Sequence, residues 1–438
     1  MRYALLFVAL FVPFSYFNHS DGWNQGARLA ELHAIVLKHT LKIDDYVSYT
    51  GDRALIDGHY YSEKAPAMTL AALPAFAATV AIQKAMGIDP DDERAKKVSD
   101  WIATSLSVGV LAALGGVAFF ALISTDIAPV PAVIATFGIF LGTIIWPYAT
   151  ALFAHAGTIG LLCIAMWAAL GDRPRDTIAG VAAGLAVASE YPAAIPVAVL
   201  GVYLGAKDWR RMIRYGVATL PGATLILLNN AAISGSPFKL GYGSNPLFPE
   251  LTATNTFGFS VPDVLALREL LVGEYRGLLP WSPVLVMAVP GLGGLFRKER
   301  ALSVAVVAGI LLVLLQVASF YTWFGGNAVG PRYLAPAIPL VALAAAYGIR
   351  RFPEMGMILA VISIGMMLMI AAIAIDPPGD VLTPLQSFYL ARIEQHRFAD
   401  NVGRLLGLPV WLSLLPPIAI PALAAWRLLA ADNRSVRA

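Results

Sequence analysis

Residues 101–123 read WIATSLSVGVLAALGGVAFFALI, a run without a charged side chain. A transmembrane helix needs about 20 predominantly apolar residues, because the hydrocarbon core of a bilayer is about 30 Å thick and a helix rises about 1.5 Å per residue. This run is long enough to span a membrane. Since backbone in lipid must satisfy its own hydrogen bonds, the run is expected to be helical.

Similar runs fill the rest of the 438-residue chain. Together with 100–123, they lie at about 3–17, 65–86, 129–146, 149–170, 177–206, 215–233, 282–296, 301–320, 333–349, 356–375 and 409–430. They predict an all-α polytopic membrane protein with about 11–13 transmembrane helices, forming a single integral membrane domain over 1–438. The composition, 58% hydrophobic and 13% charged, excludes a water-soluble enzyme.

The charged and sulfur-containing residues exclude two further classes of protein. The net charge of +3 is small for this length and gives no nucleic-acid footprint. The one cysteine, Cys163, excludes an intramolecular disulfide and a cysteine-rich metal site. The apolar N-terminus lacks a small-residue cleavage site around Phe14 to Phe17, so it is expected to be a retained first helix rather than a signal peptide.

Basic clusters occupy the joints 207–211, 297–300 and 350–351 and the C-terminal segment 434–437. Lys and Arg are enriched in cytoplasmic loops, so these clusters are expected in the cytoplasm. The polar segments 18–64, 234–281, 321–332 and 376–408 then fall outside. One conflict follows: an odd number of apolar runs separates the segment 18–64 from the joint at Tyr148, which is also expected outside. One of these runs must be re-entrant or wrongly assigned.

The run 177–206 is long, and Glu190-Tyr191-Pro192 interrupts it. Proline ends a helix and a carboxylate avoids hydrocarbon, so we expect two short helices that meet near the outer face.

The first polar segment, 18–64, holds four of the six histidines and a cluster of acids. Asn24 is expected to cap a helix that runs to about His39 and lies on the membrane surface. Asp57-Gly58, between two short apolar stretches, predicts a β-hairpin. The segment is therefore folded. Its candidate substrate-contacting residues are Arg28, Glu31, Asp57, His59, Tyr60, Tyr61 and Glu63, although each acid taken singly is equally typical of a solvated connection.

Lys64 places a cation where the chain re-enters the membrane, in the stretch 60–66 (YYSEKAP). It fits two interpretations: a lysine whose ammonium reaches the water boundary, or an anion site for a lipid phosphate. The residues around it leave both open.

Three features taken together resemble the GT-C-type glycosyltransferases, among them the protein O-mannosyltransferases and the aminoarabinose transferases. They are the RLAE stretch at 28–31, the YSEKAP stretch at 61–66 opening an apolar helix, and GPRYLAP at 330–336 opening a late helix. The resemblance covers most of the chain by the order of its elements.

The resemblance implies transfer of a sugar from a polyprenyl-phosphate donor to an acceptor at the outer face of the cytoplasmic membrane. Such chemistry needs a base for the acceptor proton and cations for the departing phosphate. Lys64 and Arg332 would be those cations, and the fork of Arg332 suits a phosphate. No cofactor and no metal ion are expected. The partners are membrane lipid, the lipid-linked sugar and an acceptor that is a protein, a lipid or a glycan.

The base is harder to assign, because the family's acidic pair after the first helix is replaced here by residues 21–26, DGWNQG. Asparagine and glutamine cannot act as bases. Asp21 is the nearest carboxylate and the first choice. Asp44, Asp45 and Asp52 are alternatives that a folded loop could bring to the site.

Several other residues are weaker candidates for substrate contact. They are His155 at a helix start, Glu190 between apolar runs, Trp323 beside the flexible Gly325-Gly326, and Tyr333. A lone histidine is more often structural, and tryptophans are also typical of the membrane interface. Glu274 and Arg276 are expected to pair with one another. The loop 234–281, with Tyr242 to Pro246, is interpreted either as a sugar surface or as a lid.

Two other classes of function compete with the transferase. A transporter or flippase for a lipid-linked sugar also needs cations that face phosphate, but transporters usually carry paired repeats, whereas the large polar segment here lies at one end of the chain. A polysaccharide polymerase or ligase would use an oligosaccharide donor instead of a single sugar.

Overall fold

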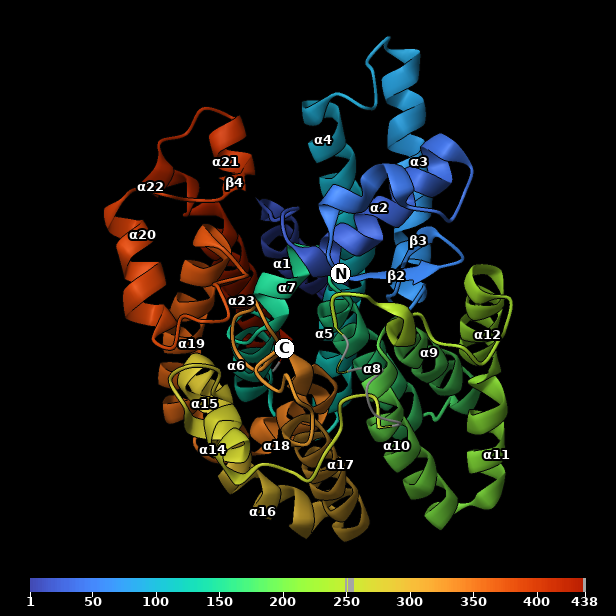
Figure 1. Ribbon diagram of the computed structural model, residues 1–438. Helices are drawn as coiled ribbons and strands as arrows, with labels where there is room; N and C mark the ends of the chain where they lie inside the picture. Colours follow the sequence, from blue (N-terminus) through green and yellow to red (C-terminus); the bar gives the residue numbers. More distant parts are fainter. Residues whose placement is uncertain (249, 251–255, 436–438) are drawn as a thin grey trace.

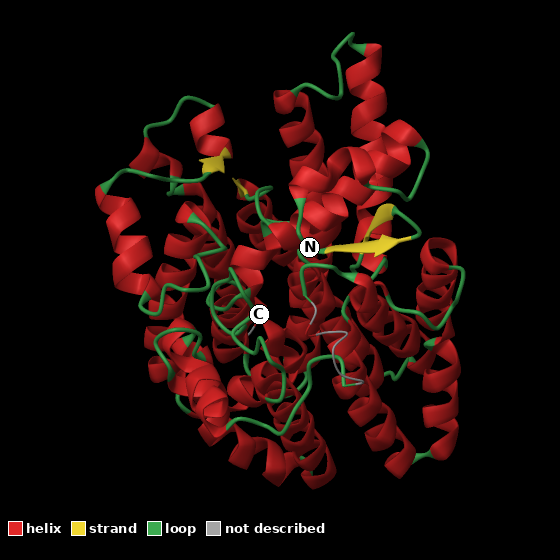
Figure 2. Ribbon diagram, viewed as in Figure 1, coloured by secondary structure: helices red, strands yellow, loops and turns green. Residues whose placement is uncertain are grey.

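The computed structural model describes residues 1–248, 250 and 256–435, with side chains placed as far as residue 430. Within this part the protein is almost entirely helical, and Figure 2 shows only two small antiparallel sheets. The basic segment 434–437 lies outside the residues whose side chains are described.

The first half of the chain contains these elements: α1 (Arg2–Tyr16), β1 (Phe17–Asn18), α2 (Trp23–Lys38), η1 (Asp44–Tyr49), β2 (Arg53–Ile56), β3 (His59–Ser62), α3 (Ala67–Ala85), α4 (Glu93–Thr104), η2 (Ser105–Gly109), α5 (Val110–Ile123), α6 (Pro129–Phe140), α7 (Ile145–Ala149), α8 (Ala154–Leu170), α9 (Asp176–Ser189), η3 (Tyr191–Ala193), α10 (Ala194–Lys207), α11 (Trp209–Ala218) and α12 (Leu220–Ser234).

The second half contains η4 (Gly241–Ser244), α14 (Val264–Val272), α15 (Leu278–Trp281), η5 (Pro283–Met287), α16 (Ala288–Lys298), α17 (Arg300–Ala318), η6 (Arg332–Ala337), α18 (Ile338–Arg351), α19 (Pro353–Ile373), η7 (Leu385–Leu390), α20 (Ala391–Glu394), β4 (Asp400–Asn401), α21 (Val402–Leu405), α22 (Val410–Ser413) and α23 (Pro416–Ser435).

These helices confirm the predicted class, an all-α polytopic membrane protein. Among the described residues, seven helices are long and apolar enough to cross a membrane, and five shorter apolar helices accompany them. The break in the run 177–206 is also confirmed, since α9 ends at Ser189 and Glu190 is extended before η3 and α10.

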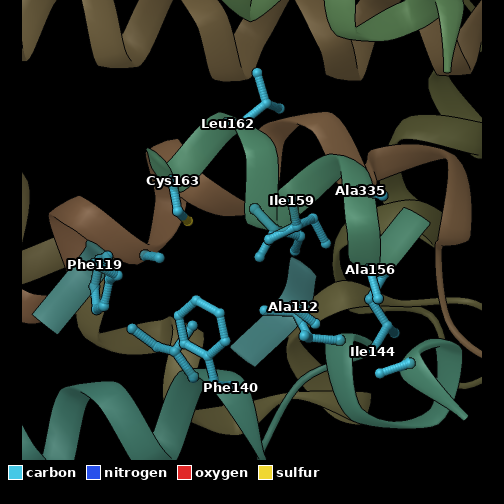
Figure 3. Close-up of a cluster of buried hydrophobic side chains, with 14 of the residues drawn as sticks. Ala112, Phe119, Phe140, Ile144, Ala156, Ile159, Leu162, Cys163 and Ala335 are labelled. Carbon is cyan, nitrogen blue, oxygen red and sulfur yellow. The ribbon is translucent and has the colours of Figure 1, made fainter. Parts of the chain in front are cut away.

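Small residues allow close packing at the centre of the bundle. Gly115 of α5 lies against Gly160 of α8, where a Cβ atom on Gly115 would overlap the backbone of Gly160. Figure 3 shows the apolar side chains around this contact, including Phe119 and Ile159. Two apolar helices associate by close van der Waals packing where small residues let their backbones approach. The α5–α8 pair is therefore the core against which the site is built.

The basic joints lie at one end of the bundle. Lys298 pairs with Asp126 in the α5–α6 joint, and Lys207 lies 2.6 Å from Glu299, which begins the next helix. These contacts bring the joints at 124–128, 207–211 and 297–300 together, and Figure 1 shows α16 and the α10–α11 joint at the bottom of the molecule. We call this the basic end.

The α3–α4 pair resolves the conflict in the predicted crossings. Met68 at the start of α3 lies against Gly157 near the start of α8, whereas Gln83 at its end donates to the carbonyl of Ala95 in α4 at 2.8 Å. Because α4 and α5 form one continuous helix that reaches the basic end at Ile123, α3 runs away from the basic end and α4 returns beside it. Two crossings, α5 and α6, are then enough to lead from the first polar segment to Tyr148, and α3 need not add a third, although it is itself long and apolar enough to span a membrane.

The first polar segment is folded as predicted, but its helix differs from the expectation. The hairpin pairs Ile56 with His59 around Asp57-Gly58, both with positive φ. Helix α2 begins at Trp23 after Gly22, so Asn24 lies inside the helix and does not cap it. Residues 25–34 of α2 are all buried, Arg28 and Glu31 included. The helix is therefore packed within protein, which contradicts the predicted position on the membrane surface.

A short sheet joins the two polar segments that are farthest apart in the sequence. Phe17 pairs with Asn401 and Asn18 with Asp400, so β1 and β4 tie the exit of α1 to the segment between α19 and α23. The residues that follow α1 and those that follow α19 are consequently neighbours.

Candidate active site

A cavity of about 900 Å³ lies at the end opposite the basic joints. Its walls come from the start of α2, from the residues on either side of the β2–β3 hairpin, from α4, from η4 and from the segments before η6 and after α19. A volume of this size lies at the upper end of the usual range for ligand sites, about 300–1,000 Å³. Lys64 and Arg332, which are far apart in the sequence, both line it.

Lys64 sits at the centre of a buried polar group in this wall. Its Nζ lies 2.8 Å from Oδ2 of Asp52 and 2.9 Å from Oε1 of Glu63. The side-chain amide of Asn245 donates to Oε2 of Glu63 at 2.7 Å and to the carbonyl of Gly51. Burial alone would lower the pKa of Lys64, but the carboxylates of Asp52 and Glu63 raise it. Lys64 is therefore a fixed cation with two anionic partners.

Arg332 is the second cation. It makes no ion pair among the described residues, although the charge of Asp52 acts on it. Its side chain is 9% exposed, and its Nε has no hydrogen-bond partner in that part of the chain. The guanidinium lies over the rings of Phe153 and Tyr333, with 5.5 and 5.1 Å to their centroids. A buried guanidinium is costly unless its donors are used, so this group is prepared for an anion from outside the chain.

The backbone beside Arg332 is held close to it. Gly325 has a φ of 80°, and a Cβ there would lie 3.0 Å from Nε of Arg332. This glycine stretch therefore approaches Arg332 closely. Arg276, fully buried, donates to the carbonyls of Phe324 and Gly326 at 3.1 Å each, and so holds the stretch in place. The predicted Glu274–Arg276 pair does not form, because these carbonyls satisfy the arginine.

Four predicted residues lie behind the cavity wall instead of lining it. Arg28 donates to Oδ1 of Asn24 at 2.7 Å, and burial raises the pKa of Glu31 to about 7. His155 and Glu190 form a buried pair, with 2.7 Å between Nδ1 and Oε1. These groups support the wall from beneath, so a direct contact with substrate is not what the geometry favours for them.

Seven predicted site residues lie elsewhere. Asp44 accepts from the backbone of Tyr60 at 2.7 Å and from His59 at 2.8 Å, and both partners are on the outer side of the hairpin. Asp45 and Asp57 are exposed. The fold of the loop does not bring Asp44 and Asp45 to this cavity, because Asp44 is held by His59 and Tyr60 of β3 and Asp45 is exposed. Away from the cavity lie Asp44, Asp45, Asp57, His59, Tyr60, Tyr61 and Trp323.

Lys64 pairs with Asp52 and Glu63, and His33 pairs with Asp100, so three further carboxylates of the lining could act as a base: Asp21, Glu93 and Asp376. Of these, Asp21 and Asp376 lie on either side of the entrance of α2. Asp21, exposed, lies at the cavity edge, and Asp376, after α19, faces it across the start of α2. A Cβ on Gly22 would lie 3.0 Å from Oδ2 of Asp376, which places that carboxylate against the α2 entrance. Burial, with the neighbouring charge of Asp21, raises the pKa of Asp376 to about 6. Asp52 also lines the cavity, but Lys64 holds it.

Sequence reasoning missed Asp376, Lys96 and Lys97. A pattern in the sequence could have identified Asp376 as a candidate, since it is an acid at the end of the apolar run 356–375, just before two prolines. No pattern in the sequence points to the two lysines, because only the pairing of α3 with α4 places them beside the cavity. Tyr242, in the loop interpreted as a sugar surface or lid, lies under the Lys64 ammonium with 5.0 Å to the ring centroid.

The cavity lining combines cations with carboxylates. Lys64 and Arg332 can hold an anionic group, aromatic side chains such as Tyr242 and Tyr321 can contact a sugar, and Asp21 or Asp376 can accept a proton. This is the set of groups that a group transfer with an anionic leaving group requires.

The fold is similar to that of ArnT from Cupriavidus metallidurans in two crystal structures. With the undecaprenyl phosphate-bound form the TM-score is 0.52 and the identity 16%, covering 97% of this chain and 74% of that chain. With the apo form the TM-score is 0.51 and the identity 17%, covering 97% and 73%. No model of a protein family matches, and no curated protein matches in sequence. The chain therefore has a GT-C-like fold, as the resemblance predicted.

Proposed function

We propose that this protein is a membrane glycosyltransferase that moves a sugar from a polyprenyl-phosphate donor to an acceptor. The observation that carries the proposal is Arg332, a buried guanidinium that makes no ion pair in the described part of the chain and lines a cavity of about 900 Å³ within a GT-C-like fold. The undecaprenyl phosphate bound to ArnT, a protein with the same fold, supports a donor of this type.

The proposed step is a direct displacement. The Asp21 carboxylate takes the proton of the acceptor hydroxyl, and the hydroxyl oxygen attacks the anomeric carbon. The bond between this carbon and the phosphate oxygen breaks, and its electron pair leaves with the polyprenyl phosphate. Arg332 and Lys64 stabilise the charge that develops on the phosphate. A single displacement inverts the anomeric configuration.

The reaction is proposed for the outer face of the cytoplasmic membrane. The cavity lies at the end of the bundle away from the basic joints, and basic joints favour the cytoplasm. No cofactor is proposed, because a sugar already linked to a polyprenyl phosphate carries its own leaving group.

The test uses the purified chain in liposomes that contain a panel of undecaprenyl-phosphate monosaccharides, with a membrane extract as the source of acceptors. Release of undecaprenyl phosphate coupled to labelling of a new product is expected. Movement of the donor between leaflets without release would instead identify a flippase, and transfer only from oligosaccharide donors would identify a polymerase or ligase. Either outcome contradicts the proposal.

A further inference from the structure

A second cavity of about 430 Å³ adjoins the first. It lies where β1 and β4 join the exit of α1 to the segment after α19, and it is lined by residues of both. Asp21 and Asp376 line both cavities. The two carboxylates therefore lie between the two cavities and are within reach of a group in either one.

The lining of the second cavity is polar with an aromatic side. Asn18, His19, Arg392 and Asp400 contribute polar groups, and Phe388 and Phe398 contribute rings. The Arg392 guanidinium lies over the Phe388 ring, 4.2 Å from its centroid, and makes no ion pair among the described residues. Hydroxyl groups both donate and accept, so carboxylates and a guanidinium together suit a polyhydroxylated ligand, whose apolar ring faces can rest on the phenylalanines.

The charge of this cavity selects against an anionic ligand. Three carboxylates, Asp21, Asp376 and Asp400, stand against the one guanidinium of Arg392. Nε2 of His19 lies 2.8 Å from the carbonyl of Ala371 and must donate to it, and burial lowers the pKa of His19 to about 4, so this imidazole is neutral. The first cavity differs, because Lys64 pairs there with Asp52 and Glu63, and Arg332 makes no ion pair among the described residues.

We propose that the second cavity is the acceptor site and that it takes a neutral glycan, whose attacking hydroxyl lies between Asp21 and Asp376. This inference rests on the proposed function for the identity of the donor. During transfer, Asp21 takes the proton of the acceptor hydroxyl as the hydroxyl oxygen bonds to the anomeric carbon, and polyprenyl phosphate leaves from the first cavity. A peptide acceptor fits less well, since peptides usually bind in extended grooves or along strand edges and this is a pocket.

The test measures binding at each cavity separately with the full purified chain. Undecaprenyl phosphate is the probe of the first cavity. Maltotriose, mannotriose and chitotriose, followed by saturation-transfer NMR, are the probes of the second. Ala399, which lines the second cavity, is replaced in Ala399→Trp to fill it, and Ala78→Trp at an exposed position of α3 is the matched control.

At least one trisaccharide is expected to bind the wild type and the control. Ala399→Trp and Arg392→Gln should weaken that binding tenfold or more, while undecaprenyl phosphate binding stays within twofold, which also shows that both variants are folded. The inference is overturned if no trisaccharide binds, if filling the cavity leaves binding unchanged, or if only a serine-containing peptide or an anionic sugar competes there. Failure of undecaprenyl phosphate to bind would instead count against the proposed function.

Discussion

Arg332 is the residue on which donor binding is proposed to depend, because its buried guanidinium has donors left for an anion. Arg332→Ala should lower the transfer rate about 100-fold or more, in line with the loss of a group that stabilises developing charge. Arg332→Lys should rescue it only in part, since an ammonium lacks the planar fork. Arg268→Ala, whose side chain is 72% exposed, is the control. Full activity of Arg332→Ala would contradict the assignment.

Glu31 makes the stability of the protein depend on pH. Burial raises the pKa of Glu31 to about 7 from an ordinary value of 4.5, so the folded state keeps its proton at pH values where the unfolded chain has lost it. Stability from this group is full below pH 4.5 and is lost as the pH rises to 7. Glu31→Gln stays neutral at every pH. The free energy of unfolding of this variant, taken relative to that of the wild type, should therefore increase by about 2–3 kcal/mol between pH 5 and pH 8.

Thermal unfolding at these two pH values checks the sign. Glu354→Gln, at an exposed position, should show no such trend. If the stability of Glu31→Gln relative to the wild type instead decreases as the pH rises, Glu31 is bound as a charged group by Arg28.

At the scale of elements, the α5–α8 contact should tolerate no added methyl group. Gly115→Ala places a Cβ against the backbone of Gly160, and overpacking of this kind costs about 1–3 kcal/mol. Gly365→Ala in α19 meets nothing within 4 Å and should be neutral or stabilising, because alanine favours a helix over glycine. Unfolding midpoints in detergent compare the two, and an equal effect would mean that α5 and α8 are farther apart.

The α3–α4 hairpin makes a prediction about topology. Asp91→Cys at its tip and Asp57→Cys at the β-hairpin turn should react with a membrane-impermeant maleimide from the same side, and Arg351→Cys only from the opposite side. The native Cys163 is buried, so the background should be low. Labelling of Asp91→Cys together with Arg351→Cys would mean that α3 crosses the membrane after all.

At the scale of the whole molecule, the donor cavity gathers walls from both halves of the chain, so a ligand there should stabilise the entire fold. A ligand that binds only the folded state at 100 times its Kd adds about 2.7 kcal/mol. Undecaprenyl phosphate should therefore raise the Tm of the wild type by several degrees and that of Arg332→Ala by clearly less. An equal shift in both would show that the lipid binds elsewhere, on the apolar surface.

The sequence by itself determined the class, the GT-C-like order of elements, the break at Glu190 and the folded first segment. The class, the break and the folded segment follow from local signals, namely the length of apolar runs, the cost of a carboxylate in lipid and the turn chemistry of Asp57-Gly58, whereas the GT-C-like order of elements rests on the family resemblance. It also singled out Lys64 and Arg332, two cations at the entry points of helices.

Only the tertiary structure decided which residues share a cavity. Asp44 and Asp52 are equivalent in sequence, but the hairpin turns one to solvent and the other toward Lys64. The β1–β4 pairing brings Asp376 to Asp21 across more than 350 residues of chain, and no local pattern encodes such a contact. The crossing of α3 likewise depends on packing, because a helix of sufficient length and hydropathy can lie against protein as well as in lipid.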